Sequence, residues 1–169
     1  MPSAATGTRP ARASADATSG RITDIAKAFA DEGAARALDG WLDYLVSEKR
    51  ASANTVEAYV RDLEVFFSFL SGHLGGHVTL NALQDLRTAD FRAFLAARRN
   101  DDLSSRSLAR ALSALRSFFR FLERKNILAN PHLSALRSPK IPRALPRSVA
   151  PDAARAMMDG DAVASVSRG

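Results

Sequence analysis

Apolar residues recur with the period of an α-helix in four segments of this chain, and the first is residues 34–48. Its apolar positions are Leu38, Trp41, Leu42 and Leu45. The spacing i, i+3, i+4 and i+7 places such residues on one face of a helix. The pattern therefore predicts an amphipathic helix that buries this face.

Two further helices are predicted over 55–71 and 89–99. The stripe of 55–71 consists of Val56, Tyr59, Val60, Leu63, Phe67 and Leu70, and that of 89–99 of Phe91, Phe94 and Leu95. Asn54 and Thr88 precede these segments and are residue types favoured at the N-cap. Between the helices lies a glycine-rich loop, which we expect to dock through Leu80, Leu83 and Leu86.

The fourth predicted helix covers 105–125, with Ser104 or Ser105 as its N-cap. Its core stripe consists of Leu108, Leu112, Leu115, Phe119 and Leu122, flanked by Ala111 and Phe118. No segment shows the alternation of paired strands. The fold class predicted by these patterns is all-α, with four main helices.

The flanking sequence divides the chain into four parts. Residues 1–20 are small, polar and aperiodic, which predicts a disordered tail, with a transit peptide as the alternative. Residues 21–130 form the helical domain, opening with a weak turn near 22–30. Residues 131–150 hold four of the seven prolines and predict an extended linker. Residues 151–169 contain a short helix at 151–159, interpreted as the start of a truncated second domain.

Composition excludes several classes of function. The chain has no cysteine, so disulfides and thiolate chemistry are excluded and a reducing, cytoplasmic location fits. No apolar run approaches the roughly 18 residues that a membrane span requires. The start lacks the apolar stretch of a secretory signal. We therefore expect no membrane partner.

The positive charge of the chain is concentrated in one block. Overall the net charge is +6, yet residues 104–147 hold ten basic residues and a single acid, Glu123. A local positive field is typical of proteins that bind a polyanion. A solvated basic face is the alternative interpretation.

The polar edge of the fourth predicted helix carries a regular series of cationic and hydroxyl side chains. Its members are Arg106, Arg110, Ser113, Ser117, Arg120 and Arg124, with Arg116 beside them. Steps of three and four keep them on one stripe. A helix of this kind fits the DNA major groove, where arginine pairs with guanine edges or with phosphates. The stripe therefore indicates nucleic-acid binding, unless it serves only solubility.

Other candidate chemistry is weaker. His73 and His77 lie in a glycine-rich loop without nearby carboxylates, so no metal site is predicted. Tyr44 and Tyr59 are interpreted as packing residues with a polar tip. No phosphate-binding glycine motif is present, and no cofactor is expected. Thr55 at a helix start could seat a phosphate or could serve capping alone.

Two segments resemble the core-binding domain of the tyrosine recombinases, or integrases. Residues 55–70, TVEAYVRDLEVFFSFL, resemble its second helix. Residues 104–152 resemble its fourth helix, its Asn-Pro turn and its Pro-Lys linker. The Xer subgroup matches best, and its XerC branch better than XerD. The resemblance implies a SAM-like orthogonal bundle that forms half of a clamp around one recombination half-site.

The resemblance also implies which residues contact DNA. In the family the second and fourth helices face the major groove, and the linker joins two domains. The corresponding residues here are Thr55, Arg61, Arg106, Ser107, Arg110, Arg116, Lys140 and Arg143. The implied partners are double-stranded DNA and a second, XerD-like recombinase subunit. The intact parent would cut and rejoin DNA to resolve chromosome dimers.

Catalysis in this family uses a tyrosine, arginines, a lysine and histidines of a second domain. No residue of this chain maps to that set, so the resemblance implies no catalytic residue here, although the full-length parent would be an enzyme. Three alternatives stay open. The chain could be the core-binding domain of a transposon or integron integrase, a helical DNA-binding or adaptor protein without an enzymatic parent, or a protein-interaction bundle.

Overall fold

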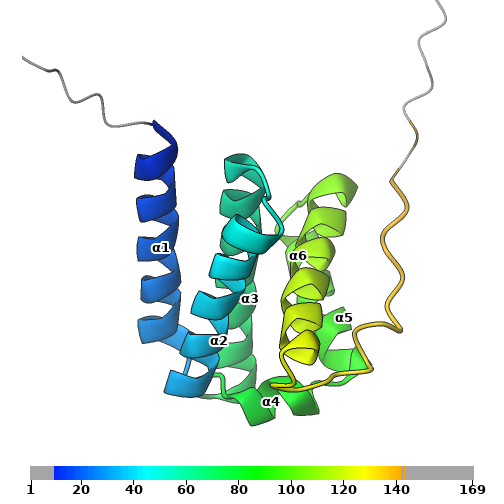
Figure 1. Cartoon of the computed structure of the whole chain (residues 1–169). Helices are drawn as coiled ribbons and strands as arrows, with labels where there is room; N and C mark the ends of the chain where they lie inside the picture. The colour runs from blue at the N-terminus through cyan, green and yellow to red at the C-terminus, as the bar shows by residue number, and fades with distance from the viewer. Residues whose placement is uncertain (1–9, 142, 144–169) are drawn as a thin grey trace, which may run out of the picture.

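The computed structural model describes residues 10–141 and 143, and these residues form six α-helices and one π-helical turn. The elements are α1 (Pro10–Phe29), α2 (Glu32–Asp43), the π-turn η1 (Tyr44–Glu48), α3 (Ala53–Leu74), α4 (Leu80–Asp85), α5 (Thr88–Asn100) and α6 (Ser105–Arg124) (Figure 1). The described residues contain no β-strand. The predicted all-α, SAM-like class is confirmed, and the four predicted helices correspond to α2 with η1, α3, α5 and α6.

Most of the helices begin at a side chain that caps the first turn. Ser104 accepts a hydrogen bond from the Ser107 amide at 3.2 Å, which confirms one of the two predicted caps of α6. The prediction for α3 was wrong, because Ser52 rather than Asn54 caps it, accepting from the Thr55 amide at 3.2 Å. The helix thus starts at Ala53, two residues before the predicted start at 55.

The N-cap of α5 differs from the one predicted. Thr88 is the first helical residue rather than the N-cap, and the cap position is Arg87. The Asp90 carboxylate accepts a hydrogen bond from the Arg87 amide at 2.7 Å and a second, at 2.9 Å, joins it to His73 Nε2. These bonds favour the ionised carboxylate and lower the pKa of Asp90 below its usual value. The contact also ties the start of α5 to the end of α3.

The core is a cluster of aromatic and aliphatic side chains centred on α3 and α6. Phe66 of α3 meets Phe94 edge-on, with ring centroids 5.1 Å apart, and stacks on Phe91 at 6.1 Å. Trp41 of α2 is fully buried and meets Phe118 of α6 edge-on at 5.7 Å. The predicted stripes are buried throughout, except that Tyr59 and Leu80 are only half-buried. Phe66 lies outside the predicted stripe of α3 because that helix is covered on more than one side.

Helix α1 corrects the prediction of a disordered tail through residue 20. It starts at Pro10, runs for 20 residues and packs against α2 and α3. Ile22 and Ile25 are buried, and Arg21 forms an ion pair with Glu64 of α3 at 3.1 Å. Its first half has few apolar residues, so the helix depends on tertiary packing rather than on a local pattern. Residues 1–9 lie outside the described residues.

The segment after α6 folds back across the end of the bundle. Asn130 Nδ2 donates to the carbonyl oxygens of Leu83 and Leu86, both at 2.9 Å, while its Oδ1 accepts from the His132 amide. Leu133 and Leu136 are buried against the core. The first part of the predicted linker is therefore docked on the bundle. The helix predicted at 151–159 lies outside the described residues.

Candidate nucleic-acid interface

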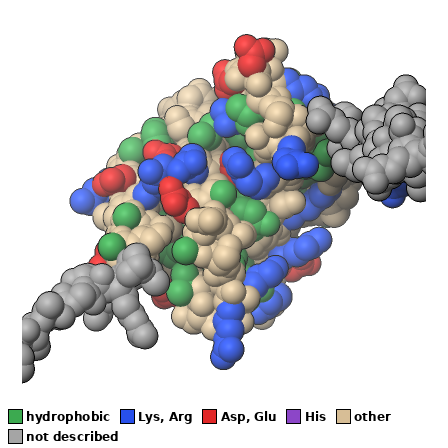
Figure 2. All heavy atoms as spheres, turned by 90° about the horizontal axis from the view of Figure 1, so that it is seen from above, with side chains coloured by type: hydrophobic (Ala, Val, Ile, Leu, Met, Phe, Trp, Pro, Cys, Tyr) green, Lys and Arg blue, Asp and Glu red, His purple; other side chains and the backbone are tan. Residues whose placement is uncertain are grey.

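Helix α6 separates an apolar face from a cationic edge. Its nine buried residues are all apolar and lie in the bundle. On the opposite edge Arg106, Arg110, Ser113, Arg120 and Arg124 are exposed, while Arg116 and Ser117 are half-buried. Figure 2 shows Lys and Arg side chains exposed on the face of the molecule that is seen from above. The predicted amphipathic arrangement of α6 is confirmed.

A cationic hollow of about 360 Å³ lies beside this edge. We use that name for the depression lined by Tyr44, Lys49, Tyr59, Ser113, Arg116, Ser117, Arg120, Phe121 and Arg124. Four of these residues are cations, and none is acidic. They come from η1, the turn after it, α3 and α6, so tertiary folding brings together charges that are distant in sequence. Convergent cations and hydroxyls of this kind suit a phosphate group.

Neighbouring side chains fix one end of the hollow. Arg124 donates to the Tyr44 hydroxyl at 2.9 Å, and its guanidinium carbon lies 4.6 Å from the centre of that ring. Glu48 lies within 3.5 Å of Arg124 and 3.7 Å of Lys125. Tyr44 also packs on Phe121, as expected of a packing residue with a polar tip. Glu48 therefore offsets part of the positive charge at this end.

Arg110 has a buried carboxylate as its partner. Its Nε donates to Asp62 Oδ2 at 2.8 Å and its Nη2 donates to Asp62 Oδ1 at 3.1 Å. The Asp62 side chain is 3% exposed, whereas that of Arg110 is 42% exposed. The hydrogen bonds that Arg110 donates to Asp62 raise the pKa of Arg110, so the guanidinium stays charged. The pair links the middle of α3 to the first half of α6.

Arg116 belongs both to the hollow and to the docked linker. Its Nη1 donates to Ser138 Oγ at 2.8 Å and its Nη2 donates to the Leu136 carbonyl oxygen. Ser117, the next residue, accepts a hydrogen bond from the buried Trp41 indole at 3.1 Å. Both side chains are therefore oriented by contacts within the chain.

Three other predicted contact residues form local hydrogen bonds. Arg61 is paired with Glu57 of the same helix at 2.7 Å. The Thr55 hydroxyl lies 2.9 Å from Ser52 Oγ at the start of α3, and Ser107 Oγ accepts from Ser104 Oγ at 3.1 Å. Each hydroxyl thus contacts the serine that caps the start of its helix.

The remaining cations have no such partners. Arg106, Arg120, Lys140 and Arg143 are exposed, and none forms a hydrogen bond or ion pair with another described residue. No local sequence pattern brings Lys49 and Tyr59 to α6, because they reach the hollow from separate elements. For Lys49, the only signal in the sequence was the basic pair that it forms with Arg50 just before α3.

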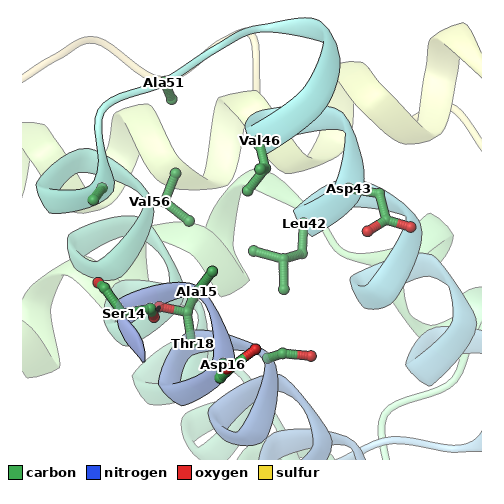
Figure 3. Close-up of a pocket in the computed structure, with 11 residues that line it drawn as sticks. Ser14, Ala15, Asp16, Thr18, Leu42, Asp43, Val46, Ala51 and Val56 are labelled. Carbon is green, nitrogen blue, oxygen red and sulfur yellow. Dashed lines mark hydrogen bonds between the residues drawn. The ribbon is translucent and has the colours of Figure 1, made fainter. Parts of the chain in front are cut away.

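A second depression, of about 340 Å³, differs in character. It lies between α1, the end of α2 with η1 and the start of α3, where Leu42, Val46 and Val56 face Ala15 (Figure 3). Asp16 and Asp43 are its charged residues, so it does not suit a phosphate. The described residues contain no group of three or more potential metal ligands, and none of the described helices is long and apolar enough to span a bilayer.

Comparisons with known proteins agree with this architecture. Residues 38–126 match the family model of the phage integrase N-terminal SAM-like domain. The chain is similar to the tyrosine recombinase XerC of Bradyrhizobium diazoefficiens, with 44% identity over 81% of this chain and 43% of that protein. It is also 42% identical to the XerC of Brucella suis over 79% of this chain and 42% of the relative.

A third relative, the XerC of Methylobacterium nodulans, is 50% identical over 72% of this chain and 37% of its own length. The chain thus spans about two fifths of the length of the curated relatives that it matches. No solved structure matches it significantly. Since the family model covers more than half of the chain, the chain belongs to the tyrosine recombinase (phage integrase) family, whose N-terminal SAM-like domain it carries.

Proposed function

We propose that this chain is the DNA-binding half of a site-specific tyrosine recombinase and grips a recombination half-site through the major groove. The observation that carries the proposal is the cationic hollow beside α6, four cations with no acid among its lining residues. Its hydroxyls and guanidinium groups match the donors that DNA phosphates accept. The similarity to XerC proteins supports an intact parent that cuts and rejoins DNA to resolve chromosome dimers, working in the cytoplasm with a XerD-like partner.

Catalysis belongs to a second domain in this proposal, and none of the described residues has a role in bond cleavage. Tyr44 and Tyr59 line the hollow, but Tyr44 packs on Phe121 and accepts a hydrogen bond from Arg124. These contacts fit a packing residue with a polar tip, and the proposal gives Tyr44 no catalytic role. The chain therefore supplies binding and orientation.

The test is binding of the 169-residue chain to a mixed-sequence DNA duplex at several salt concentrations, followed by fluorescence anisotropy. We expect log affinity to fall linearly with log salt, by about 0.9 per phosphate contacted. The double variant Arg106→Ala with Arg120→Ala removes two cations that have no partner in the described structure. It should weaken binding on all sequences and make the salt slope shallower by about two.

A matched control removes two cations elsewhere, by Lys27→Ala with Arg36→Ala on α1 and α2. It changes the net charge equally, and both side chains are exposed away from the lining of the hollow. Its salt slope should stay that of the parent chain. Absence of duplex binding even at low salt would overturn the proposal and favour a protein-interaction bundle.

A further inference from the structure

Asp62 is the only acidic residue buried among the described side chains. It lies in the middle of α3, and both of its oxygens accept hydrogen bonds from Arg110 of α6. A buried carboxylate is costly to desolvate unless it is paired and hydrogen-bonded. Its partner, however, stays 42% exposed on the cationic edge of α6, so only one member of the pair is enclosed.

The way in which Asp62 binds leaves part of the arginine free. The carboxylate occupies the side of the guanidinium formed by Nε and Nη2. The end of the group, formed by Nη1 and the second hydrogen of Nη2, makes no bond to any described residue. This end is the fork that pairs with two acceptors in one plane, as in a carboxylate, a phosphate or the O6 and N7 atoms of guanine.

The charge of the pair also matters. Asp62 offsets the charge of Arg110, so the arginine adds little to the general attraction for DNA, unlike Arg106 or Arg120. What Asp62 provides is direction, because a fork held by two hydrogen bonds to a rigid helix has few conformations to lose on binding. Arg61, one residue earlier on α3, is the contrasting case, since it pairs with Glu57 and both side chains are about half exposed.

We propose that Asp62 is a positioning residue for DNA recognition, which holds the Arg110 fork so that it recognises a guanine edge in the major groove. This inference rests on the proposed function. It assigns Arg110 to reading sequence, whereas the cations of the hollow bind the phosphate backbone. Asp62 itself does not touch DNA.

The experiment selects sequences from a randomised duplex pool with the full chain and with two variants. Asp62→Asn keeps the size of the side chain but removes its charge, and Arg110→Lys keeps the charge but lacks a planar fork. With the parent chain we expect enrichment of guanine at one position. In both variants the preference for guanine at that position should fall by roughly tenfold, the scale of one bidentate contact. Circular dichroism and thermal melting establish the folded fraction of each variant.

Glu57→Gln is the matched control, since it also removes one carboxylate that pairs with an arginine on α3. Both Asp62→Asn and Glu57→Gln make the chain more positive and should raise affinity for duplexes that lack the recognised guanine. Only Asp62→Asn should lose the guanine preference. If the pair were purely structural, Asp62→Asn and Arg110→Lys would lose stability, but the folded protein would keep its preference for guanine. That result would overturn the inference.

Two further outcomes separate the inference from the proposed function. If the parent chain binds duplex DNA but enriches no guanine, the positioning role is wrong and the DNA-binding function stands. If the parent chain binds no duplex at low salt, both are wrong.

Discussion

The arginines on one edge of α6 have different partners and therefore different capacities. Arg110 is held by a buried carboxylate, Arg116 by the backbone and a hydroxyl of the linker, and Arg124 by Tyr44 and Glu48. Arg106 and Arg120 have no partner among the described residues. Like charges three and four residues apart destabilise a helix. Asp62 and Glu48 relieve part of that repulsion, while the unpaired positions remain available to an anion.

The pairing of Arg110 makes its removal costly to the fold. Arg110→Ala would leave the Asp62 carboxylate buried without a partner, and breaking a buried pair in this way costs about 3–5 kcal/mol. We expect the free energy of unfolding in urea to fall by about 3 kcal/mol, on the low side because Arg110 is partly exposed. If this variant loses DNA binding, its stability must be measured as well, because unfolding alone would abolish binding.

Arg120→Ala is the comparison for that measurement, since its side chain is exposed and unpaired among the described residues. Its unfolding free energy should stay within about 0.5 kcal/mol of the parent. An Arg110→Ala variant as stable as Arg120→Ala would mean that the pair with Asp62 contributes nothing to stability.

Sequence spacing could predict the exposed edge of α6 but not these partners. Arg110 and Asp62 are 48 residues apart, and Arg124 and Tyr44 are 80 apart. Asp62 lies outside the predicted apolar stripe of α3, where a polar residue is expected to be exposed. Its burial follows only from the crossing of α3 and α6, which a local pattern does not encode.

At the scale of elements, prediction succeeded where a helix has one buried face. The predicted apolar stripes of α2, α5 and α6 are all buried in the structure. It failed for α1, where small and polar residues fill the first half of the helix and only Ile22 and Ile25 mark its buried side. Such a pattern is too short to show a period, and packing against α2 and α3 decides the outcome.

The short helix α4 depends on a residue outside it. It has six residues, too few for a stable helix alone, and Asn130 donates to carbonyl oxygens at its carboxyl end. Asn130→Ala should leave those partly buried carbonyls without this donor and lower the free energy of unfolding by about 1–3 kcal/mol. In this variant, backbone hydrogen exchange should speed up in residues 80–86 and 130–136 more than it does in α3.

His132→Ala serves as a neighbouring control for Asn130→Ala. Its side chain is exposed, and its backbone rather than its ring makes the hydrogen bonds. It should retain the stability and exchange pattern of the parent. If residues 80–86 exchange equally slowly in the parent and in Asn130→Ala, the hydrogen bonds from Asn130 are not needed to hold α4 in place.

At the scale of the whole molecule, the cationic edge of α6 and helix α1 lie on opposite sides of the bundle. Helix α6 with the cationic hollow lies on one side of α2 and α3, and α1 lies on the other (Figure 1). The family model begins at residue 38, so α1 lies ahead of the matched region. The hollow is a tertiary feature, so its full lining could be identified only from the packing of η1, α3 and α6.

This arrangement predicts that α1 supports stability without contributing to the DNA contact. Ile22→Ala with Ile25→Ala removes two fully buried side chains, each worth about 2–5 kcal/mol when truncated in a core. The melting temperature should fall strongly, while the folded variant at low temperature should keep the duplex affinity and salt slope of the parent. Leu74→Ala is the control, because that side chain is 45% exposed and its truncation should change neither property. An unchanged melting temperature in the double variant would place α1 outside the cooperative unit. A shallower salt slope in the double variant would instead mean that α1 holds cations against the duplex, because the slope counts phosphate contacts and is insensitive to a loss of stability in the folded protein.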